Sequence, residues 1–131
     1  MKILCDAKEG QVAIVGSCAE YLKLSEVVNA GGRIELDVSS NPWPYNSLLS
    51  AVEVKILSDS KVLVQVGAGE LRIEGSIESL KVLAEEMSDY AVEVDGRRHQ
   101  NGALGYHQHI SYYEGHYFLA EGSVEIILEH D

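Results

Sequence analysis

The feature that most constrains this chain is an internal repeat of a strand pair and a helix start. Residues 2–5 and 10–17 (KILC and GQVAIVGS) recur as KVLV at 61–64 and GELRIEGS at 69–76. In this alignment residue 61 corresponds to residue 2, and residue 69 to residue 10, so the two copies have a constant offset of 59 residues. Two copies are typical of a pseudo-symmetric domain rather than a solenoid. Coincidence is the competing explanation. We therefore expect one domain over residues 1–131, with units of about 2–57 and 61–129.

Each copy predicts a β-hairpin followed by a helix. The alternate positions of each hairpin are apolar, as one half-buried sheet face requires: Ile3, Cys5, Val12 and Ile14, then Val62, Val64, Leu71 and Ile73. Ser17 and Ser76 suit the N-cap position, and Glu20 completes a Ser-x-x-Glu capping box. Helices should therefore begin near Cys18 and Ile77.

Further strands are predicted after each helix, at residues 33–38, 51–57, 104–113 and 123–129. Residues 91–94 fit either the end of the second helix or a short strand. The predicted fold class is α+β, a curved antiparallel sheet of about eight strands with two helices on one face and a largely solvated second face.

Composition limits the partners that this chain can have. Its 131 residues include 21 acidic and 10 basic side chains, a formal charge of −11 that repels nucleic acid and anionic lipid. The acidity serves solubility or attracts a basic partner, and both explanations stay open. Only three apolar residues follow Lys2, too few for a signal-peptide core. We expect a cytoplasmic protein with Cys5 and Cys18 reduced, and no nucleic-acid or membrane partner.

A histidine-rich run is one candidate site. On a strand, His107 and His109 point the same way, and Glu114 or His116 could add a zinc ligand. His-x-His alone is a weak signal, and a polar strand face explains the pair equally well. Phosphate-loop and nucleophile-elbow motifs are absent from the sequence. We predict no catalytic residue, no metal, no cofactor and no enzymatic activity.

Two kinds of surface could bind a protein. The polar sheet face could gather charged side chains, if strand order makes them neighbours: Glu35, Glu53, Lys55, Arg72, Glu74, His107, His109, Glu125 and Glu129, with Asp37. Aromatic residues stand in the loop around Trp43, between two prolines, and in the segment 113–122. Tyrosine and tryptophan are common anchors of protein interfaces, although Trp43 could equally close one end of the core.

The second half of the chain resembles a known family. The helix GSIESLKVLA at 75–84 is followed by His107-x-His109-Ile110-x-Tyr112-Tyr113-x-Gly115-His116 and by Phe118-Leu119-Ala120. This pattern is similar to immunity protein 32, a bacterial family of polymorphic-toxin systems, from Leu71 to the C-terminus. The resemblance implies a small non-catalytic protein that binds and neutralises a cognate toxin domain.

Together these arguments predict a basic protein partner, a toxin domain, and allow for a homodimer. The predicted partner-binding residues are Trp43, His107, His109, Tyr113, Glu114, His116, Phe118 and Glu125. The alternatives are a His-dependent metal-binding enzyme or sensor, and a structural or oligomerising domain.

Overall fold

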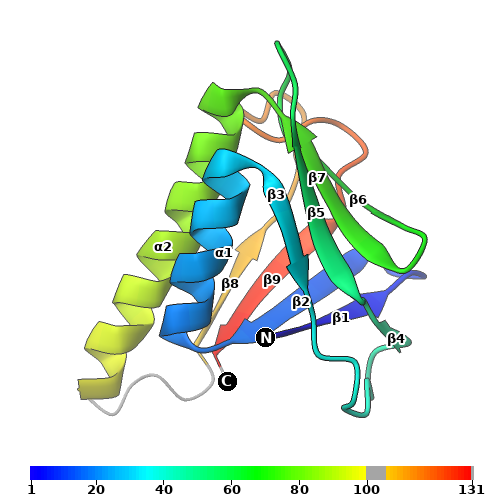
Figure 1. Ribbon diagram of the computed structural model, residues 1–131, viewed down its shortest axis with the longest axis vertical. Helices are drawn as coiled ribbons and strands as arrows, with labels where there is room; N and C mark the ends of the chain where they lie inside the picture. The colour runs from blue at the N-terminus through cyan, green and yellow to red at the C-terminus, as the bar shows by residue number, and fades with distance from the viewer. Residues whose placement is uncertain (100–105, 131) are drawn as a thin grey trace.

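The computed structural model describes residues 1–99 and 106–130. Its elements are, in chain order, β1 (Lys2–Asp6), β2 (Gln11–Gly16), α1 (Cys18–Ala30), β3 (Gly32–Glu35), β4 (Ser47–Leu48), β5 (Ala51–Ile56), β6 (Leu63–Gly67), β7 (Glu70–Gly75), α2 (Ile77–His99), β8 (His107–Ile110) and β9 (Glu125–His130). The two helices pack side by side, and the strands lie on one side of this pair (Figure 1). The predicted α+β class is confirmed.

The strands form two sheets, which corrects the prediction of one curved antiparallel sheet. The first sheet has five strands in the order β4-β1-β2-β9-β8, and the second has four in the order β3-β5-β7-β6. Two of the pairings, β2 with β9 and β5 with β7, are parallel. Each sheet thus joins a hairpin from one half of the sequence to strands from the other half. Alternating apolar residues identify a strand but carry no information about its partner, so this exchange was not predictable from the pattern.

The repeat corresponds to a hairpin and a helix in both halves, β1–β2–α1 and β6–β7–α2. The hairpins differ in register. Val15 pairs with Lys2, whereas Glu74, its counterpart, pairs with Leu63 and not Lys61. The cause is the turn, which spans residues 7–10 in the first hairpin and only 68–69 in the second. A shift of two residues keeps every side chain on its predicted face. Whether the units superpose, and whether they form one domain, stay predictions.

Both helices begin where the sequence predicts. α1 follows the N-cap Ser17, whose Oγ accepts the Glu20 N–H at 3.2 Å, while Glu20 Oε1 accepts the Ser17 N–H at 2.9 Å. Ser76 Oγ accepts the Ser79 N–H at 3.2 Å at the start of α2. Residues 91–94 are helical, so the short-strand alternative is wrong. Among the described residues, neither helix is long and apolar enough to cross a membrane.

The main core lies between the helix pair and the inner faces of both sheets. Tyr21 of α1 and Tyr90 of α2 meet edge to face there, with ring centroids 5.0 Å apart. Its other fully buried large side chains come from every layer: Ile3, Ile14, Leu24, Leu49, Leu71, Ile73, Leu80, Leu83, Met87 and Leu119. Because the helices cover the inner faces, the outer sheet faces and the loops at either end are left for binding.

Candidate protein-binding surface

Three of the predicted residues meet on the outer face of the first sheet. Strand register sets His107 opposite Glu129, and His109 opposite Ile127. The two imidazole rings are exposed neighbours, with centroids 5.1 Å apart. His109 Nδ1 lies 3.4 Å from Glu125 Oε1. We call His107, His109, Glu125 and Glu129 the β8–β9 face.

Neighbouring side chains hold Glu125 in place. Its carboxylate accepts hydrogen bonds from Gln11 Nε2 at 3.0 Å and from Ser111 Oγ at 2.8 Å. Glu125 is thus contacted from three places: by Gln11 of β2, by His109 of β8 and by Ser111, the residue after β8. A carboxylate oriented by such partners is a preorganised acceptor for a cationic group, because it loses less conformational freedom when it binds. In the described residues, no group of three or more His, Cys, Asp or Glu side chains is placed to hold a metal ion.

An apolar row crosses the same sheet face. Leu48, Leu4, Ala13, Ile127 and His109 are successive partners across β4, β1, β2, β9 and β8. Leu4, Ala13 and Ile127 are buried, with Val15, Tyr45 and Leu48 packed against them. The sequence predicted a largely solvated outer face and gave no sign of this buried row, which Tyr45, from the segment between β3 and β4, helps to cover.

Trp43 belongs to this covering segment. Its N–H donates to Asn41 Oδ1 at 3.0 Å, and the Tyr45 N–H donates to the Pro42 carbonyl at 2.8 Å, so two local turns hold the loop. The Trp43 side chain is 80% exposed. The structure thus excludes the alternative in which this side chain closes one end of the core.

The segment after β8 is built around a buried histidine. His116 is 5% exposed, and its Nδ1 accepts the N–H groups of Phe118 and Leu119 at 3.2 and 3.0 Å. Phe118 is also buried, at 3% exposed. Tyr113 and Tyr117 flank His116 with ring centroids at 4.6 and 5.4 Å, and both are largely exposed. His116 and Phe118 therefore support the loop from inside, whereas the tyrosines and Glu114 face solvent.

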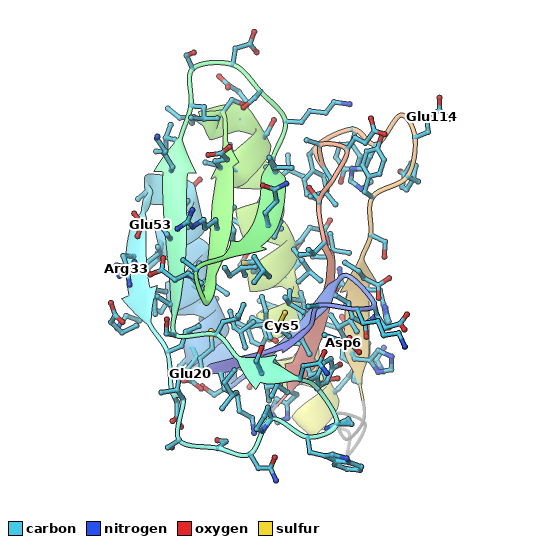
Figure 2. The ribbon with its side chains drawn as sticks, turned by 90° about the vertical axis from the view of Figure 1, so that its right-hand side faces the viewer. Cys5, Asp6, Glu20, Arg33, Glu53 and Glu114 are labelled. Atoms are coloured by element: carbon cyan, nitrogen blue, oxygen red, sulfur yellow. The ribbon has the colours of Figure 1, made fainter. Side chains whose placement is uncertain are left out.

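The predicted binding residues do not form one continuous patch. The segment between β3 and β4, which carries Trp43, lies at one end of the molecule (Figure 1). Glu114 lies at the opposite end (Figure 2). His107, His109 and Glu125 lie together on the sheet between these ends. The sequence could not reveal this separation, because it depends on where the loops leave their strands. Partner contact by any of these residues stays a prediction.

Charged residues that the sequence grouped on one polar face are divided between the two sheets. On the second sheet, Arg33 binds Glu35, Glu53 and Glu70, with its guanidinium nitrogens 2.7, 3.3 and 2.9 Å from their oxygens. Figure 2 shows Arg33 and Glu53 side by side on this sheet. These hydrogen bonds, above all those that Arg33 donates to Glu70, raise the pKa of Arg33 above its ordinary value. Because Arg33 already binds three carboxylates of the same chain, this ion-pair network on the second sheet is complete without a partner protein.

A cleft opens between the sheets, and the sequence gave no signal for it. It measures about 420 Å³, and its lining residues come from β1, the β1–β2 turn, β2, β6 and the chain before β9: Cys5, Asp6, Ala7, Gly10, Gln11, Gln65, Val66, Gly122 and Val124. These segments are far apart in sequence and meet only because β9 pairs with β2. Cys5 is a free, buried thiol, and its burial, then Asp6, raises its pKa.

Comparison with known proteins supports the family suggested by the residues. Neither the curated proteins nor the solved structures gave a match. The family model described as Immunity protein 32 matches residues 70–131, which include β7, α2, β8 and β9. The β8–β9 face and the segment after β8 that is built around His116 lie wholly within this match. Over residues 70–131 the chain is therefore similar to the Immunity protein 32 family.

Proposed function

We propose that this chain is a non-catalytic immunity protein that binds a bacterial toxin domain in the cytoplasm and neutralises it. The observation that carries the proposal is the family match over residues 70–131, since an immunity protein implies a toxin as its partner. Neutralisation by binding needs an accessible, preorganised surface rather than a catalytic group. The β8–β9 face and the exposed tyrosines of the next loop have that character.

Electrostatics supports a basic partner. The chain carries a formal charge of −11, and two of its carboxylates lie on the β8–β9 face, where Glu129 pairs with His107 and Glu125 lies beside His109. Complementary charge mainly raises the association rate and selects the partner, while buried aromatic contacts slow dissociation. We therefore assign steering to Glu125 and Glu129, and anchoring to Tyr113 and Tyr117.

The test is binding to the toxin-like C-terminal domain that we expect the neighbouring gene to encode. Biolayer interferometry should give saturable binding, and Glu125→Lys should slow association. Glu78→Lys, on the exposed first turn of α2, is the matched control because it changes net charge equally. A larger effect of Glu125→Lys than of Glu78→Lys supports this face as the site. No binding at micromolar concentration contradicts the function.

Charge reversal at Glu125 removes its bonds to Gln11 and Ser111, so its fold must be checked. Thermal unfolding followed by circular dichroism provides this check: equal melting temperatures of the wild type and the variant show that the variant folds. Tyr113→Ala gives a second, independent readout, because an exposed anchor should change dissociation rather than association. If both variants bind like the wild type, the β8–β9 face and its loop are not the toxin-binding surface.

A further inference from the structure

The cleft between the two sheets has a rigid floor. The chain before β9 first runs along β6, where the Val124 N–H donates to the Val64 carbonyl at 2.9 Å. It then crosses to the first sheet, where the Glu125 N–H donates to the Gly10 carbonyl, also at 2.9 Å. Ser123 Oγ accepts the Val64 N–H at 3.1 Å. The crossing chain thus joins both walls of the cleft and fixes their separation.

The walls combine apolar groups with one carboxylate. Val66 is 37% exposed although it is a large apolar residue on a strand, and Val124 and Ala7 add further apolar surface. Asp6 lies beside the buried Cys5 at the cleft (Figure 2). One Asp6 oxygen accepts the Glu9 N–H at 3.2 Å. Because a carboxylate has about four acceptor sites, this bond orients Asp6 and leaves capacity for a ligand.

This combination matches an arginine side chain better than other groups. Arginine has an apolar stem that can lie against valines, and a planar guanidinium that binds a carboxylate through two parallel hydrogen bonds. It is also less strongly hydrated than lysine, which favours its entry into a narrow site. The amides of Gln11 and Gln65 offer further acceptors at the cleft. The volume of about 420 Å³ is within the range of about 300–1,000 Å³ typical of ligand sites.

The cleft is also continuous with the proposed binding surface. Gln11 lines the cleft, and its Nε2 donates to Glu125 Oε1, the carboxylate that lies beside His109. A protein seated on the β8–β9 face would therefore reach the mouth of the cleft. We infer that the cleft receives an arginine side chain of the protein partner, with the guanidinium on Asp6 and the stem against Val66 and Val124. This inference rests on the proposed function for the source of the arginine.

The first test uses a small probe and does not depend on the toxin. Nα-acetyl-arginine-N-methylamide is titrated into the labelled protein, and backbone amide signals are followed by NMR. We expect saturable shifts at cleft residues Gly10, Gln65 and Gly122, about tenfold weaker affinity in Asp6→Asn, and weak binding of the uncharged citrulline analogue. Absence of saturable shifts, shifts away from the cleft, or equal binding of the citrulline analogue would overturn the inference.

The second test uses the toxin-like domain. Asp6→Asn and Val66→Trp, which fills the cleft, should each weaken its binding about tenfold or more. The matched controls are Asp59→Asn and Val92→Trp, at exposed positions outside the cleft lining. Equal melting temperatures show that each variant folds. If the wild type binds and the cleft variants bind equally well, the inference fails while the proposed function stands. If the wild type does not bind, the proposed function fails and the NMR titration alone decides whether the cleft takes arginine.

Discussion

At the scale of single residues, His116 has the clearest structural role. It supplies one acceptor atom to two consecutive backbone N–H groups inside an aromatic loop. His116→Ala leaves both donors without this acceptor, and a buried unsatisfied group costs about 1–3 kcal/mol. We expect the free energy of unfolding in urea to fall by about that amount or more. His107→Ala, at an exposed position of β8, should cost less. Equal losses would contradict the role of His116.

The pKa of His116 also predicts how the stability of the protein depends on pH. Burial, followed by the nearby Lys61, lowers the pKa of His116 below its ordinary value. The folded protein therefore favours the neutral imidazole, and this contribution is complete above the unfolded-state pKa of about 6.5. It should be lost as the pH falls from about 6.5 toward the lower folded-state pKa, because the unfolded chain binds the proton first.

The measurement for this pH effect compares urea unfolding at pH 7.5 and 5.5. His116→Asn can still offer an acceptor two residues before a backbone N–H, but it does not titrate. The wild type should lose more stability than His116→Asn over this interval. Parallel pH profiles of the two proteins would show that His116 does not cause the loss.

At the scale of elements, α1 is tied to the parallel pair β2–β9 by one hydroxyl group. Tyr21 is 1% exposed, its Oη accepts the Glu129 N–H at 3.0 Å, and the hydroxyl lies within hydrogen-bonding distance of the Ile14 carbonyl. Burial, then Tyr90, raises the pKa of Tyr21 above its ordinary value, so the hydroxyl stays protonated. This contact links a helix to two strands from opposite halves of the sequence.

Tyr21→Phe should therefore weaken this junction while preserving the aromatic packing with Tyr90. We expect a loss of about 1–3 kcal/mol in the free energy of unfolding, since a buried N–H loses its acceptor. Tyr117→Phe, at a side chain that is 65% exposed, is the matched control and should be nearly neutral. Hydrogen exchange should also speed up at the Glu129 amide. Unchanged exchange there would contradict the assigned role.

Local chemistry explains which elements the sequence predicts well. Helix starts were correct because Ser17 and Ser76 act within one turn of the chain. The parallel pairing of β9 with β2 was not predicted, because β9 could form its hydrogen bonds beside many strands. Only packing of the core determines that its neighbour is β2. The two-residue shift at Leu63 has a different, local origin, since turn length sets hairpin register.

At the scale of the whole molecule, the charge of −11 predicts a salt-dependent association. Raising salt from about 0.05 to 0.5 M shortens the Debye length well below 10 Å. The association rate with the toxin-like domain should fall by about tenfold or more, while the dissociation rate changes little. Stopped-flow fluorescence can separate the two rates. An association rate that is indifferent to salt would remove electrostatic steering from the account.

Only one feature of the candidate surface, the shared strand face of two histidines, was predictable from the sequence. His107 and His109 share a face because strand side chains alternate, which the sequence alone indicates. Their proximity to Glu125 depends on the β8–β9 pairing, and the separation of the segment between β3 and β4 from Glu114 depends on the two-sheet architecture (Figures 1 and 2). The burial of His116 and Phe118 likewise follows from packing, since each could equally be an exposed loop residue in the sequence.

Neutralisation of the toxin is the central claim, and growth of a bacterial culture tests it most directly. The toxin-like domain of the neighbouring gene is induced alone, with this chain, or with Glu125→Lys, and colony-forming units are counted. The account predicts that the domain alone stops growth, that the wild-type chain restores it, and that the variant, produced at an equal level, restores it less. A toxic domain whose effect is unchanged by the wild-type chain would contradict the account.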